Sequence, residues 1–591
     1  MRSKHRSPSR ASLPSRPIQD RPDPTPLLFA EGLDPQEVAR LLRPYGVTDW
    51  READANLQSL AGDPLTRQKL GAILSDLLAG IAETADPDRA LVHWDRYVQA
   101  TINRGTLYDY LRESPRLLHY LCIIFGNSPA MADTLIRDPT LVYWLSSPGV
   151  LDQAPTQRSL QASLEGMLGN VTAKELQLDA LRRFKRREML RIGMRDLLRL
   201  ASVPETTTAL SDLACVLIHA AYGIVEADLR SCYGRPRERN RRGVWVDSGF
   251  AVIGMGKLGG RELNYSSDVD LIYVYSDDGM TTGPDEQGQR TAQTMGKITR
   301  GIPNEEYFER LARELTHALT DVTTEGTVFR VDLRLRAEGT VGQLSRSLKS
   351  YEQYYATRGQ TWERMALLKA APVAGDQQVG RAFLRLMRPF ILGHGYRTES
   401  DSRRLLLEVR GVKDMIDRKV AKRGQESRNV KLGTGGIREI EFLVQSIQLL
   451  GGRRMPAIWQ RGTQASLKRF QEAGLLAGAE AKALSSAYVF LRDVEHKLQM
   501  VHDLQTHALP EDAQELTRCA VRLGYDAANR SEAMTRFLAD HRSHTEYVNG
   551  LFRTFFVHPE QSTLLRRVMK RLSAGHSSSP LPSPPRGERR R

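Results

Sequence analysis

The sequence contains few cysteines and no long apolar run. Four cysteines, Cys122, Cys215, Cys232 and Cys519, occur among 591 residues, and none stands in a CxxC pair. This scarcity argues against a disulfide framework and a zinc knuckle, and it favours a reducing, cytoplasmic compartment. No stretch approaches the ~18 uninterrupted apolar residues that a membrane helix requires, and the mean hydropathy is −0.42. We therefore expect neither an integral membrane protein nor a membrane partner.

Excess charge of one sign is also scarce across most of the chain. The formal net charge is +15. Residues 1–23 carry six basic and two acidic side chains, and residues 566–591 carry eight basic and one acidic, so these ends hold +11. The long interior is left near +4, which does not predict a basic nucleic-acid-binding face. We therefore expect no specific nucleic-acid partner.

Composition and periodicity divide the chain into five ranges. The length predicts about four structural units. Helical periodicity dominates, and one β-rich stretch interrupts it, which predicts an α+β, predominantly helical protein. We expect a disordered basic tail, an N-terminal helical region, a domain with a mixed β-sheet, a C-terminal helical bundle and a low-complexity basic tail. The predicted ranges are 1–25, 26–240, 241–380, 381–560 and 561–591.

Local signals support these ranges. Helix starts are predicted where proline suits the first turn, at Ser114-Pro115, Ser128-Pro129 and Asp138-Pro139. The segments FAVIG, VDLIYVY and TVFRVDLRL predict strands, and a helix is expected around residues 307–320. Later apolar spacing, as at Leu491, Val494, Leu498 and Val501, predicts helices again.

The stretch FAVIGMGKLGGRELNYSSDVDLIYVY has two competing interpretations. Gly254-x-Gly256-x-x-Gly259 after an apolar strand matches a dinucleotide-binding fingerprint. However, only seven residues separate Gly260 from Asp268, whereas a parallel βαβ crossover needs at least about 10 to 12. The fingerprint would also bury two unpaired aspartates in a parallel strand, which disfavours it.

The alternative interpretation makes the two aspartates the functional groups. Residues two apart in a strand project to one face, so Asp268 and Asp270 would point together while Val269 and Leu271 pack behind them. Paired carboxylates suit Mg²⁺ together with phosphate oxygens. Taken alone, the pair would be interpreted more simply as a solvated strand edge.

Neighbouring motifs favour the metal interpretation. Gly259-Gly260 is expected to open a short helix whose N–H groups hold a phosphate. In TVFRVDLRLR, Asp332, Arg334 and Arg336 are expected on one face of a strand, again at period two. A third carboxylate would complete a two-metal site, and the arginines would bind phosphate oxygens.

These residues resemble the nucleotidyltransferase superfamily that includes DNA polymerase beta. More specifically, LRRFKRREMLRIGMRDLL, GMGKLGGRELNYSSDVDLIYVY, VFRVDLRLR, YYATRGQTWERMALLKA and NVKLGTGGIREIEFLVQ resemble the bifunctional glutamine synthetase adenylyltransferase/adenylyl-removing enzymes. The matches follow in order from about 181 to 445, and weaker similarity extends from roughly 100 to 556. The resemblance implies a nucleotidyltransferase mixed sheet flanked by helices.

The resemblance also implies roles for individual residues. Asp268, Asp270 and Asp332 would be catalytic Mg²⁺ ligands, holding two ions. The nucleotide and phosphate would contact a second set of residues: Gly259, Gly260, Ser267, Lys257, Arg334, Arg336 and Lys369. ADP or ATP would be the nucleotide product or substrate.

The family carries two nucleotidyltransferase domains, and this chain contains one that looks most like the first. The resemblance therefore implies removal of AMP from an adenylyl-tyrosine of glutamine synthetase by phosphorolysis, with release of ADP, in the regulation of nitrogen assimilation. Glutamine synthetase would be the protein substrate, and the signal protein PII is a possible partner. Alternatives are adenylylation from ATP at the same site, a non-catalytic module that binds glutamine synthetase or PII, and a nucleic-acid nucleotidyltransferase.

Three further features have competing interpretations. The basic run between Arg182 and Arg195 is expected to be solvated or ion-paired within the protein, rather than to bind phosphate or an acidic partner. Glu439 and Glu441 are expected at a helix surface, with a supporting role at the site as the alternative. His496, His502 and His507 do not have the spacing of a helical zinc site.

Overall fold

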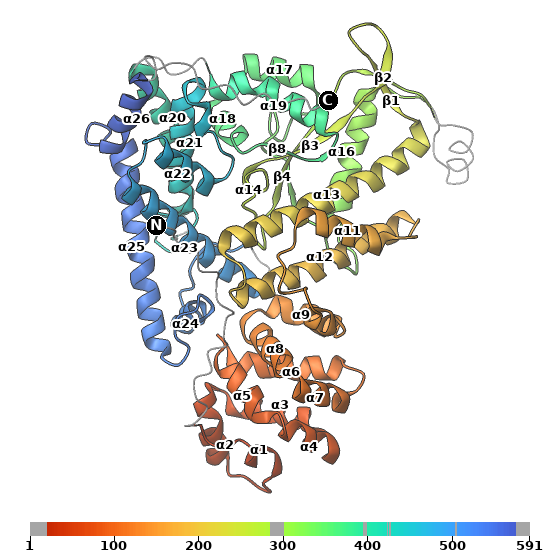
Figure 1. Ribbon diagram of the computed structural model, residues 1–591, viewed down its shortest axis with the longest axis vertical. Coiled ribbons are helices and arrows are strands. Elements are labelled where there is room, and N and C mark those ends of the chain that lie inside the picture. Colours follow the sequence, from red (N-terminus) through yellow and green to blue (C-terminus); the bar gives the residue numbers. More distant parts are fainter. Residues whose placement is uncertain are drawn as a thin grey trace, which may run out of the picture.

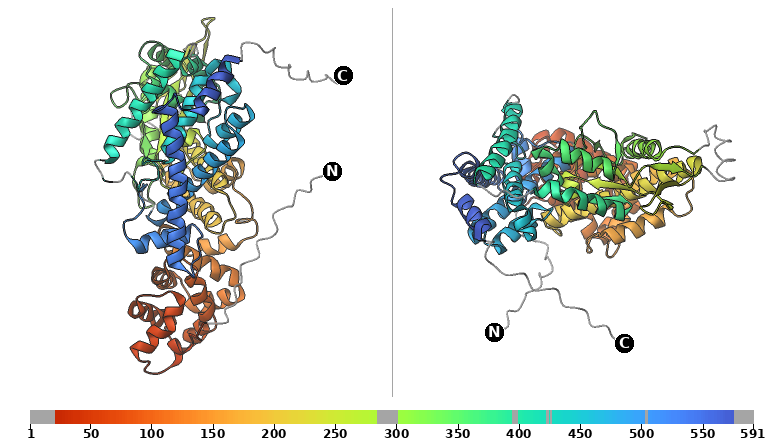
Figure 2. Two further views of the ribbon diagram at one scale, coloured as in Figure 1. Left: turned by 90° about the vertical axis from the view of Figure 1, so that its left-hand side faces the viewer. Right: turned by 90° about the horizontal axis from the view of Figure 1, so that it is seen from above.

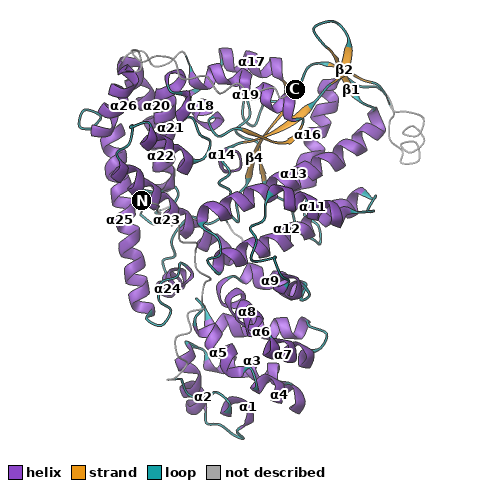
Figure 3. Cartoon of the chain, in the orientation of Figure 1, coloured by secondary structure: helices purple, strands orange, loops and turns teal. Residues whose placement is uncertain are grey.

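The computed structural model describes residues 21–283, 301–393, 399–421, 424, 427–502 and 505–574. Figure 1 shows an elongated molecule, with helices α1–α8 at one end and the larger β-sheet near the other. The C-terminal helices run along the sheet domain and reach back toward the N-terminal helices (Figure 2). Helices predominate and strands are confined to the middle of the sequence (Figure 3), so the predicted α+β class is confirmed.

The N-terminal part is helical throughout. Two of the three predicted proline starts are confirmed, since α8 and α9 begin at Pro115 and Pro129, whereas α10 begins at Leu141, two residues after Pro139. Ser128 caps α9 by accepting a hydrogen bond from the Met131 N–H. The helices are α1 Pro26–Phe29, α2 Pro35–Leu42, α3 Trp50–Ala61, α4 Pro64–Gly71, α5 Leu74–Ala82, α6 Pro87–Ala100, α7 Arg104–Glu113, α8 Pro115–Asn127, α9 Pro129–Arg137, α10 Leu141–Ser146, α11 Gln157–Leu168, α12 Lys174–Leu197 and α13 Val203–Tyr233.

Helix α13 is long and apolar enough to cross a membrane by length and composition. In the fold, 67% of its most apolar window is buried inside the protein. It packs along α12 and α16 and against strand β8 (Ala371–Gly375). Its apolar side chains are therefore accounted for by the protein core.

The larger sheet has five strands. The order is β6-β4-β3-β8, and β7 pairs with the far end of β4. The strands are β3 Phe250–Gly254, β4 Val269–Tyr275, β6 Val331–Asp332, β7 Ser345–Ser347 and β8. Since β3 and β4 pair antiparallel, with Val252 opposite Tyr273, the dinucleotide fingerprint is excluded.

The sheet lies between two helical layers. Along β3, Phe250 and Val252 pack into the cluster formed by α13 and α16 (Asn304–Thr320). Ala251 and Ile253 pack on the opposite face with α19 (Gln377–Leu392). Both faces of β3 are thus apolar, which explains its uninterrupted hydrophobic sequence.

A smaller antiparallel sheet projects beside α16 and has the order β2-β1-β5. Its strands are β1 Pro236–Arg239, β2 Trp245–Asp247 and β5 Gly279–Thr281. Together with α14 (Gly256–Gly259), α17 Leu348–Thr357 and α18 Thr361–Leu367, these elements complete the central region.

The C-terminal part is again helical, and its last helix corrects the prediction of a tail from residue 561. Residues Thr563–Ala574 form α26, because Leu564, Val568 and Leu572 recur at helical spacing and are buried. The remaining helices are α20 Glu399–Ala421, α21 Ile437–Gly451, α22 Thr463–Glu472, α23 Gly478–His502, α24 Ala513–Arg522 and α25 Arg530–Phe556. Residues 1–20 and 575–591, predicted as tails, lie outside the described residues.

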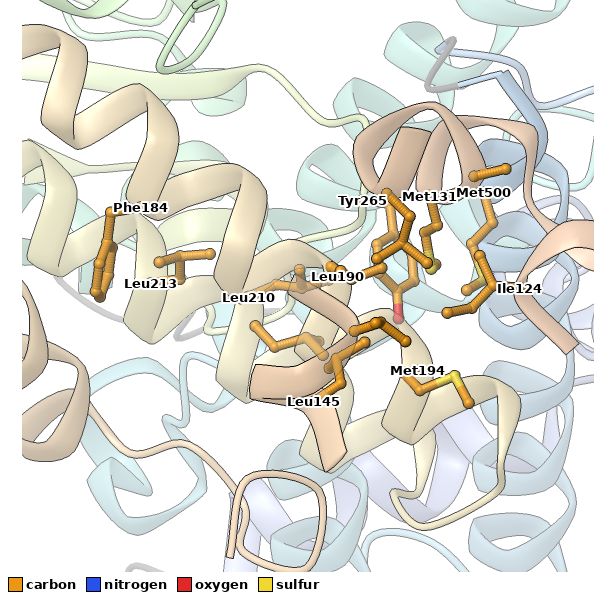
Figure 4. Close-up of a cluster of buried hydrophobic side chains, with 14 of the residues drawn as sticks. Ile124, Met131, Leu145, Phe184, Leu190, Met194, Leu210, Leu213, Tyr265 and Met500 are labelled. Atoms are coloured by element: carbon orange, nitrogen blue, oxygen red, sulfur yellow. The ribbon is translucent and has the colours of Figure 1, made fainter. Parts of the chain in front are cut away.

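A shared apolar cluster joins α12 to the rest of the molecule. Leu190 and Met194 of α12 lie in the same buried cluster as Met131 of α9 and Met500 of α23 (Figure 4). The basic run of α12 is paired inside the protein, as predicted. Arg186 Nη2 lies 2.6 Å from Glu325 Oε2, for example. This helix therefore has a structural role in the fold.

The C-terminal helices also hold the N-terminal helices by polar contacts. The Arg522 guanidinium donates to the Asn127 carbonyl at 3.0 Å, and Arg530 donates to the Ala85 carbonyl at 2.9 Å. Ser128 Oγ donates to the Met500 carbonyl at 2.6 Å. These bonds join segments separated by several hundred residues.

Candidate active site

Three aspartates come together at one end of the larger sheet. Asp270 lies in β4 directly opposite Asp332 of the parallel strand β6, and Asp268 lies two residues before Asp270. All three line a cleft of about 610 Å³. Val269 and Leu271 are fully buried behind them, as the alternation predicts.

The three carboxylates differ in their surroundings. Burial, with the nearby charge of Asp332, raises the pKa of Asp270 to about 6. Burial also acts on Asp332, but hydrogen bonds from Arg334 outweigh it and lower the pKa of that carboxyl. Arg334 Nη2 lies 2.5 Å from Asp332 Oδ2, and Arg330 Nε lies 2.8 Å from Asp268 Oδ1. Asp268 and Asp332 are thus each paired with an arginine, whereas Asp270 has no ion pair with any residue that the structure describes.

The donor chemistry of this set suits Mg²⁺, which prefers carboxylate oxygens together with phosphate oxygens and water. Within the described ranges, however, no three aspartate, glutamate, histidine or cysteine side chains gather closely enough to hold a metal ion. Arg330 and Arg334 occupy the positions beside the outer carboxylates instead. The acidic residues therefore fit a cation by type, and their role as ligands stays a prediction.

The glycine turn differs from the prediction. Helix α14 ends at Gly259, so Gly259-Gly260 does not open a helix, and neither residue lines the cleft. A Cβ on Gly259 would lie 2.1 Å from the Lys369 carbonyl, so this glycine is required by close backbone packing. Gly256 is the glycine that lines the cleft, with φ +51. A Cβ there would lie 2.4 Å from Asp270 Oδ2.

The strand that carries Asp332 is also shorter than predicted. It ends at Asp332, so the period-two projection does not continue to Arg334 and Arg336. Arg334 still lines the cleft through its pairing with Asp332. Arg336 is buried away from the cleft and donates to the carbonyls of Leu333, Thr340 and Gly342. Its predicted phosphate contact is therefore wrong, because those carbonyls satisfy its guanidinium.

The remaining predicted residues, Ser267, Lys257 and Lys369, do line the cleft. Lys369 Nζ lies 2.8 Å from Glu262 Oε2 and 2.7 Å from Glu441 Oε1, so both carboxylates already satisfy it. Glu441 thus lines the cleft as the supporting residue that the sequence left open. Glu439 instead pairs with Lys413 at 3.2 Å.

The histidines do not form a metal site in the described chain. His496 is fully buried and packs against Tyr265, with the ring centroids 5.4 Å apart. His507 Nδ1 lies 3.0 Å from Glu495 Oε1 and lines the cleft. The side chain of His502 lies outside the described residues.

Several cleft residues were not singled out from the sequence. Lys431 and Arg438 come from the C-terminal part and line the cleft, together with Trp362 of α18. About 160 residues separate Lys431 from Asp270 along the chain, so no local spacing connects them. The segment NVKLGTGGIREIEF, which carries Lys431 and Arg438, was the available signal.

Comparison with known proteins supports an evolutionary relationship. Residues 118–386 match the family model of glutamate-ammonia ligase adenylyltransferase, and residues 410–556 match that of GlnD PII-uridylyltransferase. The chain is 39% identical, over 74% of its length, to the bifunctional glutamine synthetase adenylyltransferase/adenylyl-removing enzyme of Nitrosococcus oceani, and covers 42% of that protein. The enzyme of the same name from Rhizobium meliloti is 38% identical over 71% of this chain, which covers 41% of it.

The chain therefore spans about two fifths of the length of these curated relatives. The first matched range contains the five-stranded sheet and all three cleft aspartates, and the second contains Lys431 and Arg438. Residues 118–386 therefore resemble the glutamate-ammonia ligase adenylyltransferase family, and the helical region that follows resembles GlnD PII-uridylyltransferase.

Proposed function

We propose that this protein removes AMP from an adenylylated tyrosine of glutamine synthetase by phosphorolysis, with Mg²⁺ as the cofactor. The main observation in support is the convergence of Asp268, Asp270 and Asp332 in one cleft of a region that resembles this family. The relatives are named for both attachment and removal of the adenylyl group. We favour removal because the flanking motifs of this chain resemble the first half of such enzymes.

The proposed reaction is balanced as follows. An oxygen of hydrogen phosphate attacks the phosphorus of the adenylyl group and forms a new P–O bond. The bond between phosphorus and the tyrosyl oxygen breaks, and its electron pair stays with that oxygen, which takes the proton of hydrogen phosphate. The products are ADP and unmodified tyrosine. Tyrosine has a pKa near 10, so its oxygen is a tolerable leaving group without a strong general acid.

The residues of this chain would position the reactants. Asp268, Asp270 and Asp332 would hold magnesium, which supplies charge compensation at the phosphoryl oxygens. Arg334 and Lys257 line the cleft beside them and would orient phosphate oxygens. Trp362 and Met365 provide apolar surface in the same cleft for the adenine ring. Positioning and electrostatics can supply most of the acceleration in such transfers.

The proposal is tested by incubating adenylylated glutamine synthetase with the full chain, Mg²⁺ and inorganic phosphate, and measuring ADP. We expect ADP to form, to depend on phosphate and to stop with a chelator. Asp270→Asn should lower the rate at least about 100-fold, because one charge at the reacting phosphoryl group is lost. Asp76→Asn, at an exposed position of α5, is the matched control.

The same experiment separates the alternatives. Formation of adenylylated glutamine synthetase and pyrophosphate from ATP would favour attachment of AMP at this site. Binding of glutamine synthetase or PII without ADP formation would favour a non-catalytic module. Either result would contradict the proposed activity.

A further inference from the structure

Three basic side chains line the same cleft as the three aspartates, and together they are called the basic wall here: Lys257, Lys431 and Arg438. Lys431 precedes α21, Arg438 lies in its first turn, and both line the cleft together with Lys257 of α14. The acidic wall comes from β4 and β6, and two of these three basic residues come from the C-terminal part. Carboxylates and cations therefore line the same cleft of about 610 Å³.

Two of the three cations are fixed by buried carboxylates. Lys257 Nζ lies 2.8 Å from Glu495 Oε1, and Glu495 is fully buried in α23. Arg438 Nη1 lies 3.5 Å from Glu441 Oε2, and the Arg438 guanidinium lies over the Phe442 ring at 5.7 Å. These contacts hold both cations at the cleft wall. Less side-chain entropy is therefore lost when a ligand binds to them.

Lys431 differs because its ammonium has neither an ion pair nor a side-chain hydrogen bond with any described residue. Burial lowers its pKa, although Glu495, Glu441 and Asp270 act in the opposite direction. A partly buried cation without a direct partner is costly in free energy unless an anion joins it. The position beside Lys431 is therefore the part of the cleft best suited to a bound anion.

The charge balance around Lys431 supports the same conclusion. The basic residues of the wall and its support are Lys257, Lys369, Lys431, Arg438 and Arg492. The carboxylates that contact them are Glu262, Glu441 and Glu495. Each of the other four basic side chains has an ion pair with one of these carboxylates, so Lys431 is the member of the set that lacks one among the described residues.

We propose that Lys431 and Arg438, with Lys257 beside them, form a binding subsite for a tetrahedral phosphate oxyanion in the cleft that the three aspartates also line. The oxyanion is either free phosphate or the terminal phosphate of a nucleotide. Its use in turnover depends on the proposed function, but its binding does not. Without such a subsite, the carboxylates of Asp268, Asp270 and Asp332 would repel an incoming dianion.

Direct binding to the full chain tests the subsite. Equilibrium dialysis with radiolabelled inorganic phosphate should give at least tenfold weaker binding for Lys431→Met, and Lys431→Arg should stay within about threefold of the wild type. Lys349→Met, at an exposed position of α17, is the matched control and should leave binding unchanged. The thermal midpoint of Lys431→Met should not fall, because no ion pair is lost. Unchanged phosphate binding by a folded Lys431→Met protein would overturn the proposal.

Nucleotide binding separates the two sources of the oxyanion. Loss of phosphate binding with AMP affinity kept within twofold supports a subsite for free phosphate. Weaker ATP binding together with weaker phosphate binding supports a subsite for a terminal nucleotide phosphate. If the wild-type protein binds phosphate through Lys431 but forms no ADP, the proposed function is contradicted and the subsite is supported. If Lys431→Met forms ADP with an unaltered dependence on phosphate, the subsite is contradicted and the proposed function is supported.

Discussion

Gly256 lies at the start of α14, where the backbone passes close to the carboxylate of Asp270. A side chain at this position would collide with that carboxylate. Its φ of +51 lies in the left-handed region, and a Cβ would stand 2.4 Å from Asp270 Oδ2. Gly256→Ala should therefore displace Asp270 and lower ADP formation at least tenfold. We expect the free energy of unfolding to fall by about 1 to 3 kcal/mol, measured by chemical denaturation.

Gly223 provides the control for this substitution. It lies at an exposed position of α13 where a Cβ would meet no atom within 4 Å. Gly223→Ala should raise the free energy of unfolding by up to about 1 kcal/mol through helix propensity, and it should leave activity unchanged. If Gly256→Ala has wild-type activity and stability, the requirement for glycine beside Asp270 is contradicted.

His541 of α25 is buried and predicts a dependence of stability on pH. Burial, with the nearby charge of His544, lowers its pKa to about 4, against an ordinary value of 6.5. Between these values the unfolded chain binds the proton more tightly, so stability falls as the pH falls. From pH 7 to pH 5 this residue alone should remove about 2 kcal/mol of unfolding free energy.

The measurement is urea denaturation at both pH values for the wild type and for His541→Phe, which cannot titrate. The substituted protein should lose less stability on acidification by about that amount. His317→Phe is the control, because His317 is exposed on α16. An equal loss in wild type and His541→Phe would contradict the assignment.

Among single residues, the sequence predicted those whose placement follows from short spacing. Asp268 and Asp270 stand two apart around buried strand residues, and Asp332 lies in a similar pattern, so their convergence in one cleft was predictable. A phosphate contact of Arg336 was predicted by extending the same period, but its guanidinium donates to backbone carbonyls instead. Lys431 and Arg438 were missed as cleft residues because only the folded chain brings them into the same cleft as Asp270.

At the scale of elements, a buried ionic group connects α21 to the sheet domain. Lys369, just before β8, bridges Glu262 of the segment after α14 and Glu441 of α21. Burial opposes the charge on Lys369, but the two carboxylates outweigh it and raise the pKa of the ammonium. The group therefore ties α21, which carries Arg438, to the sheet domain.

Lys369→Met should therefore leave two buried carboxylates without their cation. The free energy of unfolding should fall by about 3 to 5 kcal/mol, as expected when one partner of a buried pair is removed. Thermal and urea denaturation measure this loss. Lys482→Met, at an exposed position of α23, should change stability by less than about 0.5 kcal/mol. A thermal midpoint unchanged in Lys369→Met would contradict a bridging role.

The elements themselves were largely predictable. The strands FAVIG and VDLIYVY formed at their predicted positions because both faces of each are buried. The strand at Asp332 was overestimated, since TVFRVDLRL alternates well but pairs with β4 at only two positions. Helix α26 was not predicted because its few apolar residues alternate with basic ones and adjoin a low-complexity sequence.

At the scale of the whole molecule, α25 connects the C-terminal helices to the N-terminal helical region. The Arg530 guanidinium donates to the carbonyls of Ala85 and Thr84, at 2.9 and 2.8 Å. Arg530→Ala should lower the free energy of unfolding by about 3 kcal/mol, because charged donors to buried carbonyls are lost. Hydrogen exchange should accelerate around residues 82–86, where the contact is lost.

Arg536 of the same helix supplies the control. It pairs with Glu532 at the surface, with 69% of its side chain exposed, so Arg536→Ala should cost less than about 1 kcal/mol. If Arg530→Ala and Arg536→Ala lower the free energy of unfolding equally, a stabilising role of the contact with the N-terminal helices is contradicted.

The bond between Arg530 and Ala85 has a consequence for biosynthesis. Its partners are 445 residues apart, and translation at about 5 to 20 residues per second separates their synthesis by roughly 20 to 90 s. During that interval the N-terminal helices exist on the ribosome without the C-terminal helices that contact them. The nascent chain must therefore keep this surface from aggregating, and chaperone demand should be greatest before α25 leaves the exit tunnel.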